Sequence, residues 1–149
     1  MNAIVPVFRE PTAVEKIFNR TFGFLIGIGI GFSYNYLLQV RGRKSGKLYS
    51  TPINLLEKNG TRYLVAPRGR TQWVRNAEAD GTVTLKKGSS SREFRLRPLT
   101  DAEKPEILKA YLDDFKSEVQ RYFPMAAGSP VASFAALTRS YPAFELLAA

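Results

Sequence analysis

Short strand patterns separated by glycine-containing turns run from residue 34 to residue 99, and they constrain the fold more than any other feature. The patterns cover 34–40, 48–57, 61–67, 82–87 and 92–99, and most of the connections are short enough for hairpins. Asn-Gly between the second and third patterns is typical of a type I′ turn. Strands joined by hairpins pair antiparallel, and five or six short ones usually close on themselves to avoid exposed edges. The sequence therefore predicts a mostly antiparallel barrel or sandwich.

Helical patterns flank these strands. Apolar residues recur at helical spacing over 10–25, 71–80 and 101–123, and residues 124–149 are expected to add one or two helices. A chain of 149 residues suits one domain. We therefore expect an α+β fold, a single domain over 1–149, in which helices cap the sheet.

Two of the expected helices begin with residues that commonly cap helices. Thr71 precedes the helix 71–80 as a candidate N-cap. Thr100 and Glu103 have the spacing of a capping box, in which each side chain bonds the backbone of the other. These residues predict where the second and third helices start.

The chain contains neither cysteine nor histidine. Their absence excludes disulfides, thiolate metal sites and cysteine nucleophiles, together with the commonest general base and the commonest zinc ligand. No metal site is expected, and no catalytic residue stands out. If the protein is an enzyme, we expect a cofactor to carry the difficult chemistry.

The net charge of +9 is distributed unevenly along the chain. Residues 1–100 hold 17 Lys and Arg against 6 Asp and Glu, whereas residues 101–149 hold 5 against 7. This asymmetry predicts an anionic partner for the first two thirds, such as nucleic acid, a membrane surface or an acidic small molecule. A generally basic, solvated surface is the alternative.

An apolar, glycine-rich run at 22–32 follows the first helical pattern. Its 11 residues fall well short of the ~20 that span a bilayer, and it lacks the features of a secretory signal. The segment 1–32 is expected to form a helix followed by a packing or membrane-touching stretch. We expect a cytoplasmic protein, with peripheral contact at the inner face of the membrane.

Two cationic glycine turns follow strand ends. The turn 41–47 carries Arg43, Lys44 and Lys47, and the second turn carries Arg68 and Arg70 just before the helix 71–80. Because the two turns belong to adjoining strands, we expect them to share one groove. Arginine suits bidentate recognition of phosphate or carboxylate, and helix N-termini attract anions. The groove would suit a ligand with a flat ring and an anionic tail. The alternatives are that the first turn is a solvated hairpin tip and that the tryptophan at position 73 only anchors the core.

The segment 42–76 resembles the deazaflavin-dependent nitroreductase family of F420H2-dependent oxidoreductases. Four elements of the family pattern occur in order, and the resemblance extends over about residues 36–99. They are the Gly-Arg-Lys-Ser-Gly turn, Thr-Pro-Ile on the next strand, Val-Ala at a strand end and Trp-x-x-Asn on a helix, at 42–46, 51–53, 65–66 and 73–76.

This resemblance implies a flavin-reductase-like split β-barrel that binds coenzyme F420, with FMN less expected. It also implies hydride transfer from reduced deazaflavin to a small, lipophilic and electron-poor acceptor: a quinone, an activated alkene or a nitroaromatic. Barrels of this kind often form homodimers, which is the expected assembly. Carried onto this chain, the resemblance implies cofactor contacts from Arg43, Lys44, Ser45, Tyr49, Ser50, Thr51, Pro52, Ala66, Pro67, Arg68, Gly69, Gln72, Trp73, Val74, Arg75 and Asn76.

The sequence leaves two other functions to weigh against this one. A non-redox protein could use the same barrel to bind a lipid or another anionic ligand, with the segment 22–32 at the membrane. A nucleic-acid binder is not expected, because no aromatic residues interleave with the basic turn and the helix 101–118 is rich in Asp and Glu.

Overall fold

The computed structural model describes residues 32–149. The expected helix over 10–25 and nearly all of the apolar run 22–32 lie outside the described residues. Within 32–149, no helix combines the length and the apolar character needed to cross a membrane.

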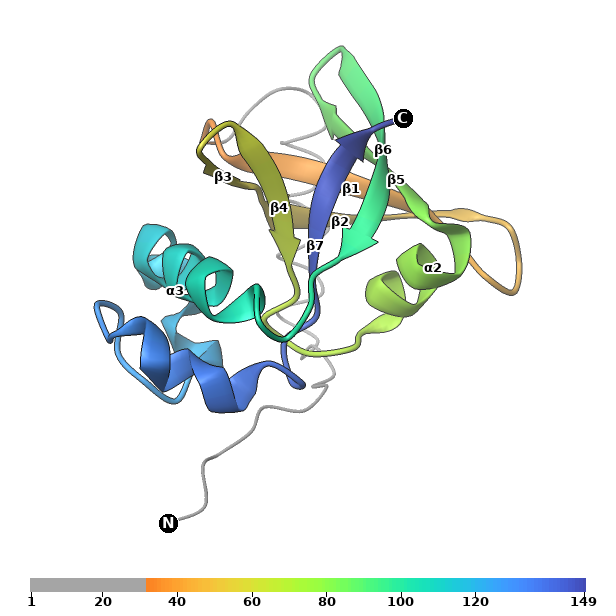
Figure 1. The fold of residues 1–149 in the computed structure, drawn as a ribbon. Helices are drawn as coiled ribbons and strands as arrows, with labels where there is room; N and C mark the ends of the chain where they lie inside the picture. The colour runs from red at the N-terminus through yellow and green to blue at the C-terminus, as the bar shows by residue number, and fades with distance from the viewer. Residues whose placement is uncertain (1–31) are drawn as a thin grey trace.

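Seven strands form one antiparallel sheet in the order β2-β1-β5-β6-β7-β4-β3. The sheet curls into a half-closed barrel (Figure 1), which confirms the expected mostly antiparallel split β-barrel. The strands are β1 (Asn35–Arg41), β2 (Leu48–Asn54), β3 (Leu56–Lys58), β4 (Thr61–Val65), β5 (Thr82–Lys87), β6 (Ser90–Pro98) and β7 (Ala143–Ala148).

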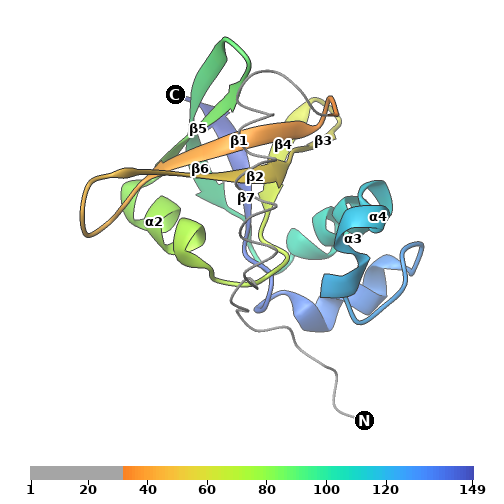
Figure 2. The same ribbon diagram turned by 180° about the vertical axis from the view of Figure 1, so that it is seen from behind.

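Helices cover the sheet in two places. Helix α2 (Gln72–Asp80) lies beside the long turn between β1 and β2, whereas α3 (Lys104–Asp114) lies with the C-terminal helices near β3 and β4 (Figures 1 and 2). The C-terminal group comprises α4 (Lys116–Val119) and two 3-10 helices, η1 (Gln120–Tyr122) and η2 (Val131–Leu137).

Each helical group buries its own apolar cluster against the sheet. One cluster fills the barrel, where Val74 and Ala77 of α2 pack against inward residues such as Leu38, Leu64 and Phe144. The second joins the C-terminal helices to the other face of β3, β4 and β7. The two groups therefore stand on different faces of the sheet.

The expected strand 48–57 is divided into β2 and β3 at Leu55. Leu55 belongs to the barrel cluster, but the next residue, Leu56, belongs to the other cluster. Successive strand residues point to opposite faces, so both leucines are buried only because the sheet is covered on both sides here. The Leu55 amide donates to the carbonyl of Tyr34, which extends the β1–β2 register by one residue pair before the chain enters β3.

The expectation of further helices in 124–149 is only partly correct. Residues 131–137 form the 3-10 helix η2, but the chain ends in strand β7, which pairs with β6 on one side and β4 on the other. The stretch Ala143–Ala148 is rich in Ala, Leu and Glu, which favour helices. Pairing on both edges and burial of Phe144 and Leu146 override that local preference.

The prediction of one continuous helix over 101–123 is wrong in its second half, where short helical segments replace it. Helix α3 ends at Asp114, and Phe115 leaves helical geometry with φ −120° and ψ 29°. No proline or glycine marks this break. Contacts with the following loop accompany it: Asp113 accepts a hydrogen bond from the amide of Gly128, and Gln120 bonds the backbone of Met125 and Ala127.

The predicted turn and caps are confirmed in part. Asn59 and Gly60 both have positive φ, 53° and 79°, as a type I′ hairpin turn requires. Thr100 and Glu103 bond each other's backbone amides at 3.3 and 2.9 Å, just before α3. Thr71 occupies the N-cap position of α2, but its side chain makes no capping hydrogen bond.

Candidate functional site

A cleft of about 1590 Å³ opens between the two helical groups. Its first wall consists of the β1–β2 turn, strand β2, the segment after β4 and the start of α2. Its second wall consists of Tyr111 and residues 117–122, from α3, α4 and η1. The two cationic turns predicted from the sequence therefore do share one groove.

Asn76 joins the first cationic turn to α2. The Asn76 side chain is only 5% exposed, and its Oδ1 accepts hydrogen bonds from the backbone amide of Arg43 at 3.1 Å and from Arg43 Nη1 at 2.7 Å. The same Nη1 donates to Gln72 Oε1 at 3.0 Å. Because Gln72 and Asn76 lie one helical turn apart, α2 holds both the backbone and the guanidinium of Arg43.

The turn itself is closed by backbone hydrogen bonds. The amide of Gly42 donates to the carbonyl of Lys47 at 2.7 Å, and the amide of Gly46 donates to the carbonyl of Gly42 at 3.0 Å. A Cβ at position 42 would lie 2.6 Å from Cε2 of Tyr49, so only glycine lets this ring lie against the turn. The hydroxyl of Tyr49 lies 3.4 Å from Ser45 Oγ. Tyr49 therefore belongs to the surface of the turn, although its side chain is half exposed.

The cleft offers cations and donors without internal partners. Within residues 32–149, the ammonium group of Lys44, which lines the cleft, forms no ion pair or hydrogen bond. The same holds for Lys47, which lies on the same turn but outside the cleft lining. Thr71 Oγ1, at the N-terminus of α2, is buried without a hydrogen-bond partner in the part of the chain that the structure describes. Positive charge, an unpaired hydroxyl and the N-terminus of a helix together suit a ligand that bears phosphate or carboxylate groups.

Trp73 contacts both the core and the cleft. Its ring centroid lies 6.4 Å from that of Phe144, with the rings tilted by 58°, and it packs against the barrel cluster. It also lines the cleft. The interpretations of Trp73 as a core anchor and as a wall for a planar ring are therefore compatible.

Most of the residues predicted as cofactor contacts line this cleft. The exceptions are Ala66 and Val74, whose side chains are buried in the barrel cluster, Gly69, which is also buried, and Arg75, which lies in an adjoining notch. The predicted residues that do line the cleft are Arg43, Lys44, Ser45, Tyr49, Ser50, Thr51, Pro52, Pro67, Arg68, Gln72, Trp73 and Asn76.

The second wall was not predicted from the sequence. Apart from Tyr111 on α3, its residues follow the break after that helix, and a single helix over 101–123 gives no sign of a cleft wall there. Glu118 on this wall accepts a hydrogen bond of 2.5 Å from the hydroxyl of Tyr34, and this bond raises the pKa of Tyr34 to about 12. Since Tyr34 directly precedes β1, this contact ties the second wall to the sheet.

Several solved structures share this fold. One, described as a domain-swapped dimer, has 22% identity and a TM-score of 0.55, covering 89% of this chain and 92% of that chain. The F420-H2 dependent reductase FDR-A has 22% identity and a TM-score of 0.51, covering 79% and 99%. An FAD-binding protein from Mesorhizobium loti has 12% identity and a TM-score of 0.50, covering 94% and 90%. At such identities the likeness is one of fold.

Comparison at the level of sequence is more specific. None of the curated proteins matches the chain. The family model described as F420H(2)-dependent quinone reductase matches residues 10–125, well over half of the chain. The chain therefore belongs to the F420H(2)-dependent quinone reductase family and is an F420-dependent oxidoreductase.

Proposed function

We propose that this oxidoreductase binds reduced F420 along the first wall of the cleft and passes a hydride to a quinone-like acceptor held against the second wall. The observation that carries the proposal is the cleft itself, in which both cationic turns, the β2 strand and Trp73 face an opposite wall of different character. A non-redox binding function is less well supported, because the matched family is a reductase family.

The anionic tail of the cofactor would lie at the basic turn and the start of α2. Arg43, Lys44 and Arg68 supply positive charge there, and Ser45 and Thr71 supply hydroxyl groups. Arginine can bind a phosphate or carboxylate through two parallel hydrogen bonds, whereas lysine acts as a point charge. The Thr71 hydroxyl has no hydrogen-bond partner among the described residues 32–149, and such a ligand would provide one.

The ring of the cofactor would lie between β2 and Trp73, against Ser50, Thr51, Pro52 and Pro67. When bound, reduced F420 supplies the hydride, so the chain's own task is to bind, orient and shield the reacting groups. Good orientation contributes up to about 7–11 kcal/mol in well-aligned reactions. This division of labour needs no histidine.

The acceptor would contact the second wall. That wall combines the half-buried ring of Tyr122 and the buried residues Tyr111 and Val119 with polar side chains, namely Ser117, Glu118, Gln120 and Arg121. Its aromatic part suits a lipophilic ring such as a quinone, and its polar part could bond the quinone oxygens. Activated alkenes and nitroaromatics have comparable electron-poor character and are the next classes to test.

Titration of the purified protein with F420, FMN and FAD tests the cofactor assignment. We expect F420 anisotropy to rise at micromolar protein, with much weaker binding of FMN and FAD, and reduced F420 to be oxidised when menadione is added. Arg43→Gln should weaken F420 binding, whereas Arg95→Gln, an equal charge change at an exposed residue outside the cleft, should not. Tight binding of FMN without F420 would contradict the proposal.

We further propose that the protein is cytoplasmic and contacts the inner face of the membrane through the apolar segment 22–32. A lipophilic acceptor would be concentrated in that membrane. Flotation with anionic liposomes tests this contact. The wild-type chain should float with the vesicles, and Leu25→Glu combined with Ile28→Glu should remain in the bottom fraction. Equal flotation of both proteins would contradict a role for the segment.

The assembly is proposed to be a homodimer of single-domain chains. The similar structure described as a domain-swapped dimer supports this assembly. Light scattering during size exclusion should give about twice the chain mass of 16.7 kDa; a mass of one chain at micromolar concentration would contradict it.

A further inference from the structure

Two asparagine side chains face each other at the cleft, one at the start of β1 and one at the end of β2. Asn35 and Asn54 are direct partners in the β1–β2 register, and both line the cleft. Asn35 Nδ2 donates a hydrogen bond to Asn54 Oδ1 at 2.9 Å. Asn35 is only 2% exposed, whereas Asn54 is half-buried. The pair therefore consists of a buried amide and a second amide that it holds at the cleft.

Hydrogen bonds fix which way round each of the two amides lies. The backbone amide of Phe32 donates to Asn35 Oδ1 at 2.9 Å, and because a backbone N–H can only donate, the atom that it meets must be the oxygen. Asn35 therefore presents Nδ2 to Asn54, and only the oxygen of Asn54 can accept from it. The Nδ2 group of Asn54 remains, accessible and without a hydrogen-bond partner among residues 32–149. The network thus leaves two N–H donors for a ligand in the cleft.

Asn54 lies on the face of the sheet that carries the C-terminal helices. Its neighbours Ile53 and Leu55 pack with the barrel cluster, and successive strand residues point to opposite faces. The C-terminal helices pack on that opposite face of the adjoining strands. Tyr34, which directly precedes β1, bonds Glu118 of the second wall. The donors of Asn54 therefore lie on the side of the cleft where the acceptor is proposed to bind.

Reduction of a carbonyl acceptor places negative charge on its oxygen. The acceptor gains a hydrogen together with both electrons of the C–H bond that breaks on reduced F420, and an electron pair of its carbonyl group moves onto the oxygen. A proton from water then completes the two-electron reduction of a quinone to a quinol. N–H donors that are already in position stabilise the charge as it develops, at no cost of reorganisation.

We propose that Asn54 is a catalytic hydrogen-bond donor, whose Nδ2 group binds a carbonyl oxygen of the acceptor and stabilises the charge that develops there. Asn35 is the positioning residue, because it turns the N–H groups of Asn54, rather than its oxygen, towards the ligand. This inference rests on the proposed function. The ring of the cofactor also carries carbonyl oxygens, and the experiment separates the two sources.

Two variants remove the donors in different ways. Asn54→Leu has no N–H group. Asn35→Asp leaves Asn54 in place but reverses its amide, because a carboxylate at position 35 can only accept and draws Nδ2 away from the ligand. Thr84→Val is the matched control, an isosteric loss of a polar group at a half-buried strand residue outside the cleft.

Single-turnover oxidation of reduced F420 by saturating menadione measures the effect of each variant. We expect Asn54→Leu and Asn35→Asp to react about ten- to a hundredfold more slowly than wild type, up to the loss caused by removing one donor from an enclosed oxyanion hole. F420 anisotropy should give dissociation constants within about twofold of wild type. Thr84→Val should match wild type in both measurements.

Combining Asn35→Asp with Asn54→Leu tests the positioning role of Asn35. The double variant should react no more slowly than Asn54→Leu alone, because residue 35 acts only through the donors of residue 54. Losses that multiply in the double variant would overturn the positioning role.

The outcomes separate this inference from the proposed function. If wild type oxidises reduced F420 and Asn54→Leu reacts as fast as Thr84→Val, the inference is overturned while the proposed function stands. Should Asn54→Leu fail to fold, a wild-type rate in Asn35→Asp would still overturn it. Tenfold weaker F420 binding by Asn54→Leu, with a wild-type rate at saturation, would mean that the donors serve the cofactor ring and would overturn the assignment to the acceptor. If wild type does not oxidise reduced F420 with menadione, the proposed function fails and the inference falls with it.

Discussion

The side-chain oxygen of Asn76 accepts two hydrogen bonds that hold Arg43 to α2, and Gln72 accepts a third. The spacing Trp-x-x-Asn on a helix puts residues 73 and 76 on one helical face, and the structure places both at the cleft. The partner of Asn76 could not be predicted, because residues 43 and 76 meet only through the curl of the sheet. Tyr49 is comparable: its contact with Gly42 depends on the shape of the turn rather than on the sequence pattern.

At the scale of the residue, we predict that Asn76 acts by positioning Arg43. Asn76→Ala removes the acceptor of one neutral and one charged hydrogen bond, so it should lower the free energy of unfolding by about 2 kcal/mol and weaken F420 binding about tenfold. Asn76→Asp keeps the acceptor oxygen and should restore stability to within about 1 kcal/mol of wild type. Its added negative charge should still weaken F420 binding, and this residual loss should shrink at high salt.

Urea unfolding and F420 anisotropy measure the two effects separately. An Asn76→Ala protein that binds F420 as tightly as wild type would show that the turn needs no support from α2.

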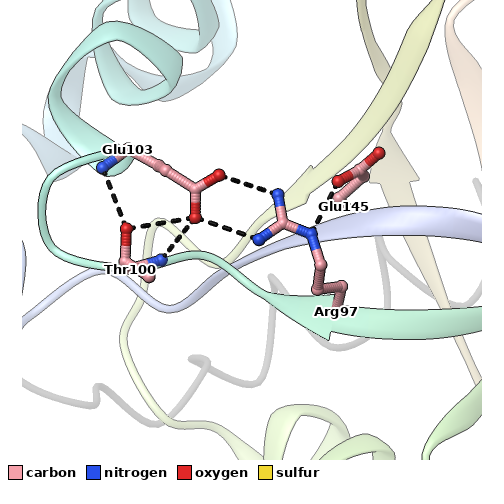
Figure 3. A network of polar contacts seen from close by, with 4 residues as sticks. All are labelled: Arg97, Thr100, Glu103 and Glu145. Carbon is pink, nitrogen blue, oxygen red and sulfur yellow. Dashed lines mark hydrogen bonds and ion pairs between the residues drawn. The ribbon is translucent and has the colours of Figure 1, made fainter.

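At the scale of the element, Arg97 joins two strands and a helix through one guanidinium. It bonds Glu145 on β7 at 2.7 Å and both carboxylate oxygens of Glu103, which precedes α3, while Thr100 bonds Glu103 in turn (Figure 3). In the sequence, Phe94 and Leu96 alternate with Arg95 and Arg97, which predicts one buried and one cationic face for β6. This alternation could not predict the network, because Glu145 lies on the unrecognised strand β7.

The network predicts a pH dependence of stability that Glu103→Gln removes. The hydrogen bond from Arg97 lowers the pKa of Glu103 from its ordinary value of 4.5 to about 2. A lowered pKa in the folded state stabilises the protein above pH 4.5, and this contribution is lost as the pH falls from 4.5 towards 2. Wild type should therefore be more stable than Glu103→Gln at pH 7 and pH 5, and the difference should narrow at pH 3.

Urea titrations at the three pH values measure this difference. Glu106→Gln is the matched control, since Glu106 is an exposed residue of α3 whose nearest cation, Lys58 Nζ, lies 3.8 Å away. A Glu103→Gln difference that stays the same from pH 7 to pH 3 would contradict the network's role.

At the scale of the whole molecule, the last strand completes the sheet. Strand β7 lies between β6 and β4, so it provides the strand pairing that joins β2-β1-β5-β6 to β4-β3, while the chain itself links the two parts at Leu55. Hairpin turns predicted the local pairs β1–β2, β3–β4 and β5–β6 because those contacts are close in sequence. The closing strand pairs with residues about 50 and 80 positions earlier, and no local signal reports such contacts.

We predict that alternate residues of β7 differ sharply in their contribution to stability. Phe144 is 2% exposed inside the barrel, whereas Leu147 is half-buried and points to the opposite face. Phe144→Ala should therefore cost about 3–5 kcal/mol, and Leu147→Ala only about 1 kcal/mol. Because Trp73 is the only tryptophan and packs against Phe144, its fluorescence should also shift in the native state of Phe144→Ala but not in that of Leu147→Ala. Equal losses of stability, or a larger loss for Leu147→Ala, would mean that β7 enters the sheet in the other register.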